Sequence, residues 1–172
     1  VLPELVGDST SYQIADVTAV TADSDGRLWI GKRNGAVYVV EDGALIQCDK
    51  AGPLRRHRVD SIVGDGAGGV WAASSYGAGV AHFRSSQDLV CYDAEREGVI
   101  PARVSAMAIG PEGTIFFASA GAQDGVGVVE YDGETFEKVE GVASGPISAM
   151  CFDQDGRMWL GSEEGLTVYG RD

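Results

Sequence analysis

Two pairs of acidic residues have the spacing of oxygen ligands for a cation. Asp23 and Asp25, and again Asp153 and Asp155, are each followed directly by glycine. An EF-hand calcium loop needs further oxygen ligands, a glutamate at its twelfth position and flanking helices, which these segments lack. The same residues are typical of a tight turn between two strands. We therefore expect hairpin turns, with a weak surface Ca²⁺ site as the alternative, and otherwise no metal and no cofactor.

Candidates for catalysis are few. The histidines are His57 and His82, and neither has a nucleophile and an acid at the spacing of a known triad. No glycine-rich loop opens a helix that would hold a phosphate. Asp60 is the one acidic side chain that we expect to face a central channel. The sequence therefore assigns no catalytic residue and favours a protein that is not an enzyme.

These residues are positioned by a segment that occurs four times. Each copy has a glycine, a short apolar strand and a large aromatic residue, which is Trp29, Trp71, Phe116 or Trp159. The four aromatic residues are 42, 45 and 43 residues apart. A period in the low forties, filled with short strands and turns, is typical of a β-propeller with one blade per repeat.

The sequence predicts an all-β fold, a β-propeller of four repeats of about 43 residues, each a four-stranded antiparallel blade. We expect a single domain, 1–172, with blades at 17–58, 59–103, 104–146 and 147–172. The last repeat ends before its fourth strand, and we expect residues 1–13 to supply that strand and close the ring. Alternatively, the N-terminal segment belongs to a further blade, and the chain is a piece of a longer propeller or half of a dimeric ring.

The core is expected between blades. The strands with the large aromatic residues are apolar on both faces, which fits sheets that are covered on both sides. We expect the four aromatic side chains to fill the gaps between neighbouring blades. Cys48, Cys91 and Cys151 are expected to be small buried residues, because neither their number nor their spacing suggests metal ligation or a disulfide framework.

Charge excludes some classes of partner. The net charge is −13, which argues against binding to nucleic acids or to anionic membranes, since both require a basic surface. The chain also has no apolar run long enough to cross a membrane.

Two segments resemble a known family. Asp23 to Gly35 and Asp153 to Tyr169 are similar to the two-component regulator propeller repeat. The resemblance implies a propeller used for sensing or binding, often outside the cytoplasm, so a periplasmic or extracellular location. It supplies no catalytic residues. Such propellers usually have more than four blades. Streptogramin lyases and calcium-dependent lactonases have repeats of similar length, so a small metal-assisted propeller enzyme is the alternative, as is a fragment of a larger sensor with no ligand of its own.

The expected blade geometry sorts the loops onto two ends of the propeller. Loops between blades, and loops after the strand with the aromatic residue, share one end and carry many of the basic residues. We expect this end to bind a protein partner, such as an acidic one, or a small anionic or carbohydrate-like ligand, because arginine forms paired contacts with carboxylates. A homodimer is a further possibility. The predicted ligand-binding residues are Arg58, Arg103, Asp60, His57, Lys32 and Arg33.

Overall fold

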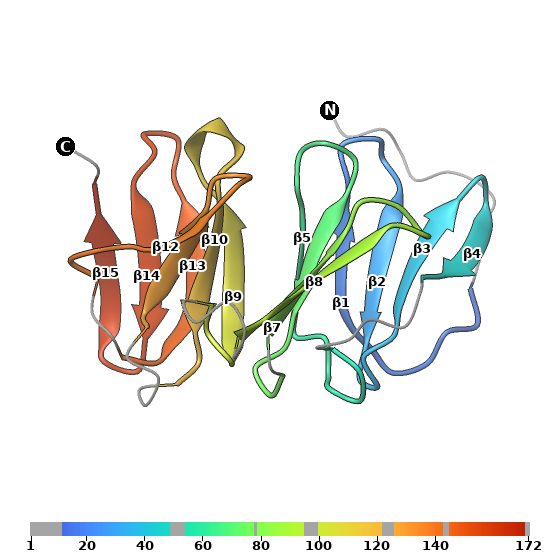
Figure 1. The fold of residues 1–172 in the computed structure, drawn as a ribbon, viewed down its shortest axis with the longest axis horizontal. Helices are drawn as coiled ribbons and strands as arrows, with labels where there is room; N and C mark the ends of the chain where they lie inside the picture. The colour runs from blue at the N-terminus through green and yellow to red at the C-terminus, as the bar shows by residue number, and fades with distance from the viewer. Residues whose placement is uncertain are drawn as a thin grey trace.

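The computed structural model describes residues 12–48, 54–77, 79–94, 100–121, 126–142 and 145–170. This part of the chain is built from β-strands, with a single short 3-10 turn, η1 (Pro111–Gly113). Among the described residues, no helix is long and apolar enough to cross a membrane. The expected all-β propeller is confirmed (Figure 1). The predicted closing strand at 1–13 lies almost entirely outside the described residues.

Four antiparallel sheets follow one another along the chain, and we refer to them as blades 1 to 4. Blade 1 contains β1 (Val17–Ala22), β2 (Leu28–Lys32), β3 (Val37–Glu41) and β4 (Ala44–Gln47). Blade 2 contains β5 (Ser61–Gly64), β6 (Val70–Ala73), β7 (Gly79–Phe83) and β8 (Leu89–Asp93). Blade 3 contains β9 (Val104–Ile109), β10 (Ile115–Ser119), β11 (Val128–Tyr131) and β12 (Phe136–Lys138). Blade 4 contains β13 (Ile147–Phe152), β14 (Met158–Ser162) and β15 (Gly165–Tyr169).

The first strand of each blade is the innermost strand of the propeller. β1 contacts β5, β5 contacts β9, and β9 contacts β13, so these four strands form a central row. In Figure 1, blade 1 extends from this row to the right and blade 4 to the left. Blade 4 has three strands among the described residues, because no described segment pairs with the free edge of β15. The described blades are antiparallel, as the sequence predicts, and in blades 1 to 3 each has four strands.

Each blade has two different faces. The anchor face carries the large aromatic residue of the second strand, and the reverse face is the opposite side of the sheet. The anchor face of blade 1 packs on the reverse face of blade 2, where Trp29 joins Ile62, Val70 and Phe83 in one buried cluster. The next two interfaces repeat this order, around Trp71 and around Phe116. The prediction that aromatic residues fill the gaps is therefore confirmed for Trp29, Trp71 and Phe116, which are fully buried.

Gly79 shows how tightly the strands approach one another. Its φ of +140° is a conformation that side-chain-bearing residues rarely adopt. A Cβ atom at this position would lie 2.0 Å from the carbonyl oxygen of Tyr92 on the neighbouring strand. Gly165 begins the equivalent strand of blade 4 with a similar φ of +130°, but a Cβ atom there would meet nothing within 4 Å.

We predict that Gly79→Ala lowers the free energy of unfolding by about 3 kcal/mol or more, because backbone strain and a steric clash add. Gly165→Ala is the matched control, and it is expected to cost about 1–2 kcal/mol from the backbone conformation alone. Urea denaturation of both variants measures the difference. Equal losses would show that the approach of Gly79 to β8 does not constrain the blade.

Candidate functional site

The carboxylate of Asp23 organises the turn between β1 and β2. Its Oδ1 accepts hydrogen bonds from the backbone N–H groups of Asp25 and Arg27, at 3.0 and 2.9 Å. Its Oδ2 accepts from Nε of Arg27 at 2.8 Å and from the indole Nε1 of Trp29 at 2.7 Å. The guanidinium also donates to the carbonyl of Gly68 in blade 2. One carboxylate therefore closes a turn, fixes a tryptophan and positions an arginine that joins two blades.

Blade 4 repeats this arrangement. Oδ1 of Asp153 accepts from the backbone N–H groups of Asp155 and Arg157, at 3.0 and 2.9 Å. Its Oδ2 accepts from Nε of Arg157 and from the indole of Trp159, both at 2.8 Å. In both blades the donors occupy the oxygens that a calcium ion would need. The described residues contain no group of three or more His, Cys, Asp or Glu side chains that could hold a metal ion.

These hydrogen bonds shift the acidity of both carboxyl groups. Burial alone raises the pKa of Asp23, but the hydrogen bonds from Trp29 and Arg27 outweigh it and hold the pKa below its usual value. For Asp153 the hydrogen bond from Trp159 is the largest influence, and it lowers the pKa to about 2. Both groups are therefore ionised at neutral pH, as a carboxylate that accepts four hydrogen bonds should be.

In blades 2 and 3, part of the aspartate, arginine and tryptophan network is absent, and other residues take its place. In blade 2, Asp65 accepts a hydrogen bond from His82 Nε2 at 2.7 Å, and the His82 ring stacks on Trp71 with centroids 4.3 Å apart. In blade 3 the aromatic residue is Phe116, whose ring has no N–H group, and the aspartate is replaced by Gly110. A Cβ atom on Gly110 would lie 2.4 Å from the Phe116 ring, so the phenyl ring occupies the space of the missing side chain.

His82 and Asp65 are therefore part of the blade packing. The His82 side chain is largely buried, and its partner Asp65 also accepts hydrogen bonds from the turn N–H groups of Ala67 and Gly69. Burial raises the pKa of Asp65, but the hydrogen bonds from His82 and the turn lower it below its usual value. The pair does in blade 2 what arginine and indole donors do in blades 1 and 4.

At the opposite end of the propeller, the structure joins three of the predicted ligand-binding residues. Nε of Arg58 lies 2.8 Å from Oδ1 of Asp60. Oδ2 of Asp60 accepts from the backbone N–H of Ser75 at 2.9 Å and from its hydroxyl at 2.7 Å. The carbonyl of Ser75 accepts from Nε of Arg103 at 3.0 Å. This chain of contacts links the entry of blade 2 to the entry of blade 3, and we call it the arginine junction. Both of its arginine residues are exposed.

The other three predicted residues lie beside the junction, on the blade 1 side. The carbonyl of Lys32 accepts a hydrogen bond from the N–H of Val59 at 3.1 Å. A Cβ atom on Gly35 would lie 2.0 Å from the carbonyl oxygen of Leu54, so the β2–β3 loop packs directly on the turn that contains His57. Arg33 is more loosely placed, with Nε 4.0 Å from Asp16 Oδ1, and both side chains are exposed.

Asp60 differs from its counterparts in the other blades. The equivalent hydroxyl groups of Thr18, Ser105 and Ser148 bond to backbone carbonyls rather than ringing a channel. Thr18 Oγ1 lies 2.7 Å from the carbonyl of Val59 in the next blade, and Ser105 bonds in the same way to Ile147. An ionised carboxylate has no hydrogen to donate to a carbonyl. Asp60 instead accepts hydrogen bonds from Ser75 and forms an ion pair with Arg58.

Two residues of this end were not anticipated from the sequence. Ser75 is the link between the two arginine residues, and Tyr76 beside it is one of the most exposed large side chains among the described residues. Both lie in the loop after β6, which is the loop class that carries Lys32 and Arg33 in blade 1. An aromatic residue in a loop is a signal that could have marked Tyr76 from the sequence. The role of Ser75 could not be inferred in this way, because it depends on a tertiary contact with Asp60.

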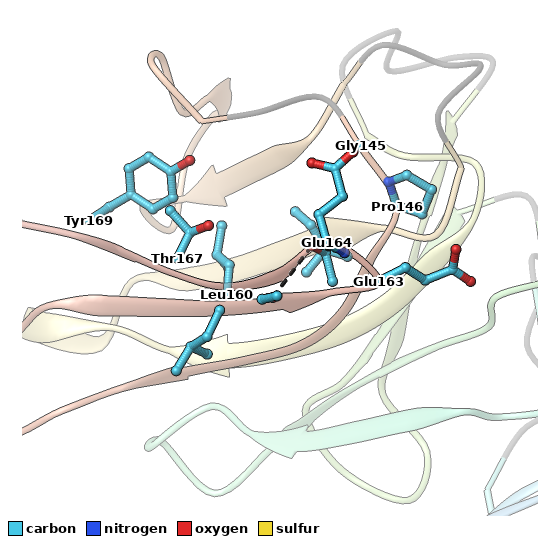
Figure 2. A pocket seen from close by; sticks show the side chains of 11 residues that line it. Gly145, Pro146, Leu160, Glu163, Glu164, Thr167 and Tyr169 are labelled. Atoms are coloured by element: carbon cyan, nitrogen blue, oxygen red, sulfur yellow. Dashed lines mark hydrogen bonds between the residues drawn. The ribbon is translucent and has the colours of Figure 1, made fainter.

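A separate pocket of about 280 Å³ lies at blade 4. Figure 2 shows Pro146, Glu163, Glu164 and Tyr169 around it. The backbone N–H of Glu164 donates to Ser162 Oγ at 3.2 Å. The described lining residues include two glutamates and none of the six predicted ligand-binding residues. Its acidic rim does not suit an anionic ligand, so it is distinct from the arginine junction.

Comparison with known families identifies the repeat. A family described as "two component regulator propeller" matches residues 11–31 and 141–164. These two segments of the chain are similar to that propeller repeat. The matched segments include Asp23 and Asp153 together with all four hydrogen-bond donors of each carboxylate. No curated protein matches the sequence.

Solved structures share the propeller fold at low sequence identity. Virginiamycin B lyase from Staphylococcus aureus is 15% identical with a TM-score of 0.70, over 95% of this chain and 59% of the lyase. The extracellular domain of the hybrid two component system BT4673 from B. thetaiotaomicron is 18% identical with a TM-score of 0.66, over 94% of this chain and 21% of that domain. The computationally designed Ika4 protein is 17% identical with a TM-score of 0.67, over 97% and 100% of the two chains.

The matched segments contain the first turn of blades 1 and 4 and their tryptophan residues. This chain spans 59% or less of the lyase and sensor structures above. Arg58, Asp60 and Arg103 lie outside the two matched segments. The arginine junction is thus a feature of this chain rather than of the matched motif.

We predict that Asp153→Asn lowers the melting temperature at neutral pH, because the amide weakens the bonds from Trp159 and Arg157. The folded pKa of about 2 lies below the unfolded value of about 3.9, so the carboxylate stabilises the fold fully above that unfolded value. This stabilisation disappears as the pH falls towards 2. The difference between wild type and variant should therefore shrink between about pH 4 and pH 2.

Thermal melts at several pH values from 7 to 2 make this measurement. Asp155→Asn is the control, because its carboxylate contacts Arg157 at 3.0 Å but does not bond to the tryptophan. A difference for Asp153→Asn that stays constant over the whole pH range would contradict the proposed role of the charge.

Proposed function

We propose that this chain is a non-catalytic binding or sensing propeller that recognises a carboxylate-bearing partner at the arginine junction. The observation that supports this most strongly is the chain of contacts through Arg58, Asp60, Ser75 and Arg103. Two guanidinium groups are held by their Nε atoms, and both side chains remain exposed. Arginine held in this way presents its terminal N–H groups in the planar geometry that matches a carboxylate.

The surroundings of the junction favour an anionic ligand. Arg55 and Arg56 are exposed on the preceding turn, and Arg56 has a φ of +70°, a conformation that is uncommon outside glycine. Tyr76 offers an exposed ring beside Ser75, which suits contact with a sugar or with a peptide side chain. Basic loops on an otherwise very acidic molecule also attract anionic ligands to this end.

The comparisons support a sensing role through the repeat family and through the likeness in fold to the extracellular domain of BT4673. The likeness to virginiamycin B lyase concerns the fold at 15% identity. The best candidate for acid–base chemistry, His82 with Asp65, is committed to blade packing. We therefore prefer binding to catalysis.

We predict that Arg103→Ser weakens binding of an acidic ligand by about tenfold to a hundredfold, as expected for loss of a charged hydrogen bond. Titration calorimetry with a short polyglutamate peptide, and separately with an acidic oligosaccharide, measures the effect at low salt. Arg103→Lys keeps the charge but not the fork of donors, and it should recover only part of the affinity.

Arg84→Ser is the charge-matched control. Arg84 is half-exposed like Arg58, but it lies at the other end of the propeller beside Asp88. Its substitution should leave binding unchanged. Equal losses in Arg84→Ser and Arg103→Ser would show that only net charge matters, and unchanged binding in Arg103→Ser would exclude the arginine junction.

A further inference from the structure

Each of the two end blades has one apolar face on which no other described blade packs. The anchor face of blade 4 carries Ala149, Cys151, Trp159, Gly161, Leu166 and Val168, as the strand pairing shows. The reverse face of blade 1 carries Val20, Ala22, Leu28, Ile30, Tyr38 and Val40. Both faces are mainly apolar, with Lys32 at one end of the reverse face, where its Nζ lies 5.6 Å from the centre of the Tyr38 ring. Within the chain, each interface between neighbouring blades joins an anchor face to a reverse face. The anchor face of blade 4 and the reverse face of blade 1 are the two halves of one more such interface.

Several residues on these faces are exposed where their counterparts are buried, although Ile30 itself is only 4% exposed. Leu28 is 41% exposed, whereas Val70, Ile115 and Met158 are at most 5% exposed. Leu166 is 68% exposed, whereas Val37, Val80 and Val128 are at most 2% exposed. Val20 is 59% exposed, whereas Ile62 is 9% exposed. Monomeric proteins rarely leave such contiguous apolar surface in water.

The polar groups of blade 4 are also arranged for a neighbouring blade. Arg157 has the position of Arg27, which donates to a carbonyl of the next blade. Ser148 has the position of Thr18 and Ser105, whose hydroxyl groups donate to the carbonyls of Val59 and Ile147 at the entry of the next blade. Asp153 holds Arg157 and Trp159 at the same distances as in blade 1, so the surface is already in the conformation that packs.

We propose that two copies of this chain close one ring, with blade 4 of each copy packed on blade 1 of the other. Blades 1 and 4 extend to opposite sides of the central row, so a second copy turned about the propeller axis presents both missing faces at once (Figure 1). In this ring Ser148 donates to the carbonyl of Val17 in the second copy, and Arg157 donates to the carbonyl of Gly26.

The lengths and areas agree with a second copy as the occupant. The chain spans 59% and 50% of the two lyase structures that share its fold, so two copies have about the length of one such propeller. The designed Ika4 protein is a separate chain of this same extent. Three strands of five residues give a face of about 14 by 16 Å, so four faces bury on the order of 1,000 Å². That area is close to the roughly 1,000 Å² expected of a specific interface.

Sedimentation equilibrium and native mass spectrometry of the 172-residue chain test this proposal. We expect twice the chain mass of 18.0 kDa at micromolar concentration. Val20→Asp, and separately Leu166→Asp, should weaken dimerisation at least about a hundredfold, because each places a charge in the apolar interface. Both side chains are exposed in one copy, so each variant should keep its circular dichroism spectrum. Cys91→Asp, at an exposed site on the outer strand of blade 2, should stay dimeric.

Mixing the two monomeric variants tests the direction of packing. A Val20→Asp copy has an unaltered blade 4 face, and a Leu166→Asp copy has an unaltered blade 1 face. These two faces can still pack on each other, so a mixture of the two variants should form a heterodimer through one intact interface. A chain that is monomeric at all concentrations overturns the proposal, and so does a stable closed four-blade monomer or an assembly of another size. A dimer that neither face variant weakens, or variants that fail to complement each other, also overturns it.

Discussion

The fold depends on how a tryptophan is held in the wedge between two blades. The large ring fills the gap, but its indole N–H requires an acceptor once it is buried. Asp23 supplies that acceptor, and a buried carboxylate in turn requires several donors, which the turn N–H groups and Arg27 provide. Blade packing, turn geometry and the placement of a cross-blade arginine are therefore consequences of one satisfied carboxylate. Phe116 and Gly110 support this argument, because the blade that lacks the indole N–H also lacks the carboxylate.

The residues that stabilise the fold and the residues proposed to recognise a ligand lie at opposite ends of the propeller. The motif residues serve the same structural purpose in blades 1 and 4, at the end of the propeller where the β1–β2 type of turn lies, and His82 and Gly110 compensate for their absence in blades 2 and 3. At the opposite end, Asp60 replaces a hydroxyl, and Arg58 and Arg103 join it. A rigid scaffold that presents variable loops at one end is a common basis for recognition.

The sequence predicted the four repeats, the strand order and the burial of Trp29, Trp71 and Phe116, because these follow from local periodicity. It was wrong in expecting Cys91 and Cys151 to be buried, and Trp159 is only partly buried. Burial of Cys151 and Trp159 requires a following blade, which local patterns cannot reveal. Loop class alone predicts that Arg58, Asp60 and Arg103 lie at one end of the propeller, and the structure links them through Ser75. The link through Ser75 and the stacking of His82 on Trp71 are tertiary contacts that no spacing in the chain encodes.

The central claim is that Asp23 and Trp29 stabilise the blade through one hydrogen bond rather than independently. A double-mutant cycle of Asp23→Asn and Trp29→Phe, followed by chemical denaturation, measures their coupling free energy. This account predicts a coupling of about 1.5–3 kcal/mol, as expected for a buried hydrogen bond to a charged group. Additive effects of the two substitutions, with no measurable coupling, would contradict it.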